Sequence, residues 1–262
     1  MKHTLKVTSI LTVLFLLSHF IGLFIVSEYV NMGDLPYGIE RPEIEENTSY
    51  VPIIIAVLLA SGIFFLLMRF NAVRVWKVWF IFATVYLLGI AFSAFVTSLV
   101  ALGIALILGL LKFYKPNVVI HNFTELFIYS GIAAIFAPMM SIIAVSILLI
   151  LISIYDAIAV WKTKHMIKMA EFHAKAKMFA GLLVPYSKNK TALLGGGDIG
   201  FTLLFSGVIL IKMGVLAAII TSLTTTVALF LLFTYSKKNK FYPAMPFLSA
   251  GCFLGLLISF LI

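Results

Sequence analysis

Long apolar segments alternate with short polar ones along the whole chain. About 20 apolar residues span the hydrocarbon core of a bilayer as a helix, and most of these segments come close to that length. The segments that read as single spans cover residues 7–25, 51–68, 193–211, 213–235 and 246–262. This pattern predicts an all-α polytopic membrane protein.

Two longer apolar segments must each be divided into two spans. Residues 79–111 carry no charge and are too long for one ordinary span, so we expect a tight helical hairpin that turns near residues 93–98. Residues 126–161 contain Pro138, and proline disrupts the interior of a helix. Two spans should therefore meet near the sequence "APMMS", which brings the predicted total to nine transmembrane helices.

Composition agrees with a single membrane domain over residues 1–262. The chain is 63% hydrophobic and 11% charged, whereas a soluble domain is about 25% charged. Cys252 is the only cysteine, so no disulfide can form within the chain, and we expect it to serve in packing. The net charge of +9 does not point to nucleic acid, because the basic residues lie in short loops between the spans.

The distribution of basic residues predicts the orientation. If the N-terminus is inside, every Lys and Arg except Arg41 and Lys212 lies on the cytoplasmic side, as the positive-inside rule requires. The first span offers no small-residue cleavage site, so we expect it to be retained. We predict an N-in/C-out protein of the cell membrane, with spans one to six in residues 1–161, a basic cytoplasmic loop at 162–192, and spans seven to nine in 193–262.

Two acidic residues stand out because they lie inside apolar segments. Asp156 precedes Lys162 by six residues, and Asp198 follows Lys190 by eight on the next span, which runs the other way. At 1.5 Å per helical residue, both lie roughly 8–12 Å from the cytoplasmic boundary. Consecutive antiparallel spans are usually neighbours, so the two carboxylates can face each other.

Such a pair suits aspartic-protease chemistry. Two carboxyl groups in contact do not both ionise readily, so they share a proton: one can activate water while the other polarises a carbonyl. Glycines at 195–197 would let a helix or a substrate backbone approach closely. A proton- or cation-coupled transporter that uses the same aspartates is the alternative from these residues alone.

Three motifs, in order, resemble the presenilin and signal peptide peptidase family of GxGD intramembrane aspartyl proteases. They are Tyr155-Asp156 on predicted span six, Gly195 to Asp198 on span seven, and Pro243-Ala244-Met245 at the start of span nine. The resemblance covers the whole chain, and its short loops are similar to those of archaeal members. Prepilin and preflagellin peptidases, a second GxGD family, usually have a lysine two residues after the aspartate, where this chain has Gly200.

The resemblance implies a presenilin-like fold and an intramembrane aspartic endopeptidase that needs no cofactor or metal. Asp156 and Asp198 would be catalytic. Tyr155, Gly195, Gly197, Pro243, Ala244 and Met245 would bind substrate or shape the active site. Met245 replaces the leucine of the family motif, and methionine is similar in size but more flexible. The partners would be transmembrane-helix substrates and the lipid bilayer, without nucleic acid, and a homo-oligomer stays open. A transporter would predict repeated halves, and no convincing repeat is present.

The basic loop carries scattered apolar residues, and three readings stay open. It can be an imperfect amphipathic helix on an anionic inner membrane surface, or a solvated connector. The resemblance favours a third reading, a substrate gate between the two catalytic spans. His165 and His173 are eight residues apart and lack a third partner, so a metal site is a poor hypothesis.

Overall fold

Nine long helices form the bulk of the described chain. The computed structural model describes residues 4–41, 43–70, 72–162, 179–187, 190–237 and 242–262. Its helices are α1 (Leu5–Met32), α2 (Tyr50–Arg69), α3 (Val73–Ser93), α4 (Ser98–Tyr114), α5 (Val118–Phe136), α6 (Ile142–Trp161), α8 (Gly196–Met213), α9 (Val215–Tyr235) and α10 (Met245–Leu261). A short antiparallel hairpin precedes α8, with strands β1 (Gly181–Ser187) and β2 (Lys190–Gly195). The predicted helical membrane architecture is confirmed, and the hairpin is an addition to it.

Seven of these helices are long and apolar enough to cross a membrane within the described residues. The other two, α4 and α10, have 17 residues each and are just below that length. A 17-residue helix is about 25 Å long, which is close to the thickness of a hydrocarbon core.

The two divisions predicted from the long apolar segments are correct. Helix α3 ends at Ser93 and α4 begins at Ser98, so the turn lies where it was expected. Pro138 lies in a 3-10 turn, Ala137–Met139, between α5 and α6. Ser141 then caps α6, because its side chain accepts a hydrogen bond from the amide of Ala144 at 3.1 Å. Backbone groups freed by the proline break are satisfied in this way.

The start of the seventh predicted span is different. Residues 190–195 form β2, and the helix begins only at Gly196. The hairpin alternates in burial, since Leu182, Val184, Ala192 and Leu194 are buried while Leu193 is exposed. This period of two is the signature of a strand, and an apolar count along the sequence does not detect it. The predicted amphipathic helix of the basic loop falls mostly on residues 163–178, outside the described residues.

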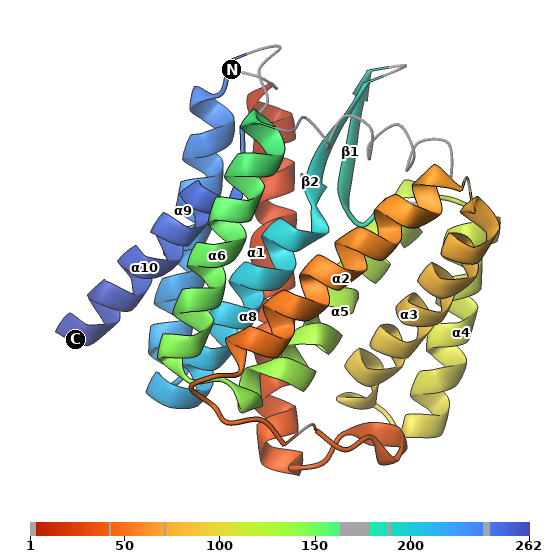
Figure 1. The fold of residues 1–262 in the computed structure, drawn as a ribbon, viewed down its shortest axis with the longest axis horizontal. Helices are drawn as coiled ribbons and strands as arrows, with labels where there is room; N and C mark the ends of the chain where they lie inside the picture. Colours follow the sequence, from red (N-terminus) through yellow and green to blue (C-terminus); the bar gives the residue numbers. More distant parts are fainter. Residues whose placement is uncertain (1–3, 42, 71, 163–178, 188–189, 238–241) are drawn as a thin grey trace.

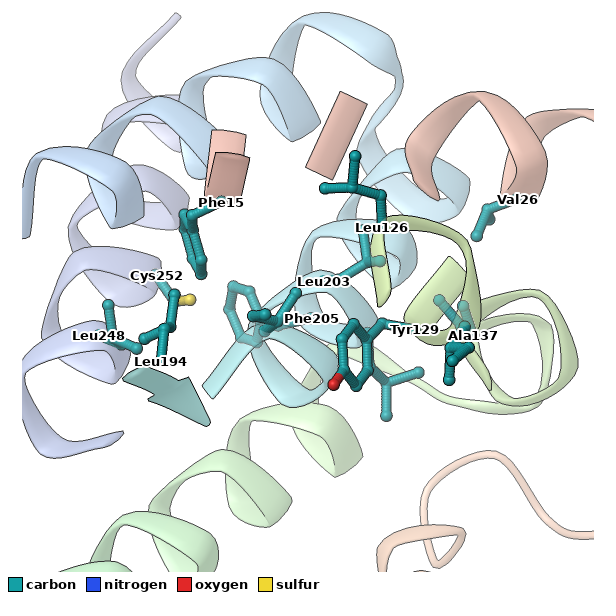
Figure 2. Close-up of a cluster of buried hydrophobic side chains, with 14 of the residues drawn as sticks. Phe15, Val26, Leu126, Tyr129, Ala137, Leu194, Leu203, Phe205, Leu248 and Cys252 are labelled. Atoms are coloured by element: carbon teal, nitrogen blue, oxygen red, sulfur yellow. The ribbon is translucent and has the colours of Figure 1, made fainter. Parts of the chain in front are cut away.

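Helix α8 lies at the centre of the bundle, where α1, α5, α6, α9 and α10 all contact it (Figure 1). Its Phe205 is fully buried, among side chains that include Phe15 of α1, Tyr129 of α5 and Leu248 of α10 (Figure 2). Cys252 is also fully buried in this core, in agreement with its predicted packing role. In Figure 1, α3 and α4 lie on one side of the bundle, α9 and α10 lie on the other, and the β-hairpin projects from one end.

Helices approach one another closely where a glycine replaces a side chain. A methyl group on Gly131 of α5 would overlap the backbone carbonyl of Leu87 on α3. At Gly255 of α10, a Cβ atom would lie 2.5 Å from the Cα of Thr221 on α9. Small residues at such contacts let membrane helices gain dispersion energy from backbone-to-backbone approach.

We expect Gly131→Ala to destabilise the fold, because the carbonyl of Leu87 is part of a helix backbone and cannot rotate away. Overpacking of this kind costs about 1–3 kcal/mol. The matched control is Gly103→Ala in α4, where nothing lies within 4 Å of the added Cβ. Thermal unfolding in detergent should show a lower midpoint for the first variant only, and equal midpoints would contradict the close packing of α3 on α5.

Candidate active site

Asp156 lies in the last two turns of α6 and faces the start of α10. Its Oδ2 atom accepts a hydrogen bond from the amide of Met245 at 3.0 Å, and the amide of Ala244 also bonds to this carboxylate. Ala244 is the N-cap of α10 and Met245 is its first residue. Amides at a helix start have no partner within the helix, so they are available to an anion.

The Pro243-Ala244-Met245 motif therefore contacts Asp156 through its backbone. Pro243 and Met245 are buried, and regular helix starts only after Ala244. The amide of Met245, which lies at the start of α10, thus pairs with the carboxylate of Asp156. Tyr155 takes another direction, since its hydroxyl bonds to Ser61 of α2 at 3.3 Å.

Asp198 occupies the first turn of α8, as the third residue of the helix. Its carboxylate accepts a hydrogen bond from the amide of Gly195, the N-cap residue. A side chain at this position that reaches back to the N-cap amide forms half of a capping box. The positive end of the helix dipole also favours a negative charge there.

The structure brings the two aspartates together. Helices α6 and α8 pack against each other, and the carboxylates lie close enough for Asp156 to act electrostatically on Asp198. Both side chains are partly buried. Each carboxylate is bonded by amides at the start of a helix, α10 for Asp156 and α8 for Asp198.

The three glycines before Asp198 differ in their surroundings. The middle one, Gly196, packs directly on Tyr129, so that a Cβ atom would come within 2.8 Å of the phenol ring. A Cβ on Gly195 would lie 3.2 Å from the Oδ2 atom of Asp198. Gly197 is exposed, and the nearest side-chain atom to a Cβ there is a ring carbon of Phe201 at 3.8 Å. The tightest approach thus falls on Gly196, which the sequence motif leaves unspecified.

A buried charged cluster lies beneath this turn and was missed by the sequence analysis. Lys112 and Glu125 are 6% and 1% exposed and form an ion pair. The hydroxyl of Tyr129 also donates to Glu125, and so does the amide of Gly181 at 2.8 Å. The i, i+4 spacing of Glu125 and Tyr129 on α5 was the available signal.

His19 of α1 is linked by hydrogen bonds to the first turn of α8, which carries Asp198. Its Nδ1 is hydrogen-bonded to Ser222 at 3.2 Å and its Nε2 to Thr202 at 3.1 Å. The hydroxyl of Thr202 lies 2.7 Å from the backbone oxygen of Asp198, to which it donates. Among the described residues, no three His, Cys, Asp or Glu side chains gather as a metal site would require. His165 and His173 lie outside the described residues.

Comparison with known proteins identifies the family. A sequence model described as "Signal-peptide peptidase, presenilin aspartyl protease" matches residues 12–262. The chain belongs to this family. A search of curated proteins gave no match.

Two solved structures of a presenilin family intramembrane aspartate protease share the fold. The one in space group C222 is 20% identical, with a TM-score of 0.68 over 97% of this chain and 98% of the other. The one in space group P2 is also 20% identical, with a TM-score of 0.67 over 96% of each chain. The fold class, inferred from apolar segments and three motifs, is therefore that of presenilin-family proteins.

The protein is thus an intramembrane aspartic endopeptidase and a multi-pass membrane protein. Family membership favours proteolysis over the transporter alternative.

The buried ion pair yields a stability prediction. We expect Lys112→Ala to destabilise the fold by about 3–5 kcal/mol, because it leaves the carboxylate of Glu125 buried without its counter-charge. The double variant Lys112→Met with Glu125→Gln should lose less than Lys112→Ala, since no unpaired charge remains. Unfolding free energies in detergent would test this order.

The matched control for that series is Lys212→Met. Lys212 pairs with Glu46 at 2.7 Å, but their side chains are 31% and 51% exposed. Exposed pairs contribute about 0–1 kcal/mol, so this variant should stay close to the wild type. If Lys212→Met lowered the free energy of unfolding as much as Lys112→Ala does, burial of the ion pair would not determine how much its loss destabilises the fold.

Proposed function

We propose that Asp156 and Asp198 are the catalytic pair of this protease. The observation that carries the proposal is their position: two carboxylates from neighbouring helices interact electrostatically, and each is bonded by amides at a helix start. A carboxylate pair that shares one proton contains both the base and the acid that peptide hydrolysis requires.

The reaction follows from the assignment of one carboxylate as the base and the other as the acid. The ionised carboxylate removes a proton from a water molecule, and the water oxygen attacks the carbon of the peptide carbonyl. The protonated carboxyl hydrogen-bonds to the carbonyl oxygen and stabilises the charge that develops there. When the tetrahedral intermediate collapses, the C–N bond breaks and the leaving nitrogen takes up a proton from the pair.

The neighbouring motif residues have separate roles in this proposal. Ala244 and Met245 orient Asp156 through their amides, and Pro243 keeps the chain before them out of the helix. Gly195 orients Asp198 through its amide, and the absence of a side chain at Gly195 leaves room beside the Oδ2 atom of Asp198. Gly197 is exposed next to Asp198 and keeps this surface of the site free of a side chain. Tyr155 shapes the site indirectly, because its bond to Ser61 joins α6, which carries Asp156, to α2.

The substrates in this proposal are transmembrane segments of other membrane proteins. Two carboxylates that activate water within an apolar helical bundle can hydrolyse only a peptide bond that enters the bundle at the depth of the membrane. The charge distribution further supports an N-in/C-out orientation, which places both aspartates toward the cytoplasmic side.

We expect Asp156→Asn and Asp198→Asn each to abolish cleavage of a model transmembrane peptide by the purified protein. The double variant should be no worse than either single one, because residues that act as a unit are not additive. Asp34→Asn is the control, since Asp34 is exposed in the loop after α1. Substantial turnover by either single variant, with the protein folded, would rule out a shared water.

A second prediction concerns the direction of the substrate. An active site is chiral, so a strand passes the carboxylate pair in one direction, and the orientation of the enzyme selects that of the substrate. We expect preferred cleavage of substrates whose N-terminus is outside, toward the cytoplasmic end of their membrane segment. Two reporters that differ only in membrane orientation would test this. Equal cleavage, or a preference for the N-in reporter, would refute the proposed orientation or the directional argument.

A further inference from the structure

Side chains of α5 close the edge of β1 that faces away from β2. The amide of Gly181 donates to Glu125 Oε2 at 2.8 Å, and its carbonyl accepts from His121 Nε2 at 2.8 Å. The amide of Leu183 donates to Asn122 Oδ1 at 2.9 Å, and its carbonyl accepts from Asn122 Nδ2 at 2.7 Å. All four outward backbone groups of these two strand residues are therefore bonded to one helix.

This arrangement substitutes for a third strand. In an antiparallel ladder, alternate residues turn both their N–H and C=O groups to the same edge, and Gly181 and Leu183 are two residues apart. On α5, His121 and Glu125 are four residues apart and share a face, with Asn122 beside them. A one-residue slip of the hairpin would point the bonded groups of β1 the other way, so these contacts specify its register.

The hairpin leads directly to Asp198. Gly181 is the register partner of Gly195, and the amide of Gly196 donates to the carbonyl of Ala180 at 3.0 Å. Gly195 in turn lies against the carboxylate of Asp198, since a Cβ atom on Gly195 would be 3.2 Å from Oδ2, and its amide interacts with that carboxylate. A displacement of β1 would therefore shift the backbone amide of Gly195, which orients the carboxylate of Asp198.

We propose that Asn122, together with His121 and Glu125, is a positioning residue that holds β1 in register and thereby aims the carboxylate of Asp198. The proposal rests on the proposed catalytic role of Asp198. Asn122 is the residue to test, because its two bonds go to the hairpin, whereas Glu125 also neutralises Lys112.

The test compares Asn122→Ala with Asn117→Ala. Asn117 caps the same helix, and its side chain accepts from the amide of Val119 at 2.7 Å. We expect Asn122→Ala to speed amide hydrogen exchange at Leu183 and Gly195 and to lower kcat by about 10- to 100-fold, with KM nearly unchanged, because a small misplacement of a catalytic group acts on the chemical step. Asn117→Ala should leave both the exchange at the hairpin and kcat near wild-type values.

A second variant keeps the shape of the side chain. Asn122→Asp retains an acceptor for the amide of Leu183 but turns a carboxylate oxygen toward its carbonyl, so exchange should rise and kcat should fall here too. This variant decides the question if Asn122→Ala does not fold.

Three results would overturn the proposal. Faster exchange at the hairpin with unchanged kcat would mean that the hairpin does not aim Asp198. A fall in kcat without faster exchange would mean that Asn122 acts by another route, and a rise in KM alone would mean that the hairpin binds substrate instead. An active Asp198→Asn variant would defeat the catalytic assignment itself, whereas an inactive one with a fully active Asn122→Ala would defeat only the positioning role.

Discussion

The cost of placing two carboxylates side by side in an apolar helical bundle governs the arrangement of this protein. A charged side chain in a membrane helix costs several kcal/mol unless polar groups replace its water. Here the replacement comes from helix starts, where amides lack intrahelical partners. The amides of Ala244 and Met245 serve Asp156, and that of Gly195 serves Asp198.

This requirement explains why the chain is irregular where it is. A helix start must lie beside each carboxylate in space: α8 starts at Gly196, two residues before Asp198, and α10 starts at Met245, whose amide bonds to Asp156 on α6. Pro243 disfavours helical backbone directly before it, and Gly195 is the extended N-cap of α8. A different solution operates at Glu125, whose charge is met by the buried ammonium of Lys112.

The sequence was sufficient to predict the helices and to single out Asp156 and Asp198 as acids within apolar segments, because both signals are local. The length of an apolar segment indicates a span, and Pro138 indicates a break. A lone acidic residue in an apolar segment indicates a functional site, because burying its charge in the membrane costs free energy. The hairpin was not predicted, since its strands carry consecutive apolar residues that merge with the next span, and only their burial alternates. Two partners of Glu125 were not predictable either: Lys112 and Gly181 are 13 and 56 residues away in sequence, and only the packed bundle joins them to Glu125.

The hydrogen bonds of the buried His19 imidazole can form only late in synthesis, because both of its partners lie far along the chain. Its two partners, Thr202 and Ser222, follow it by 183 and 203 residues. Helix α1 is therefore synthesised well before α8 and α9, and the native hydrogen bonds of its imidazole can form only when those two helices have been inserted beside it. Until then that side chain remains unsatisfied by its native partners. The core around α8 can thus be completed only after α9 has been inserted. Asp198 belongs to α8, and strand β2 directly precedes that helix.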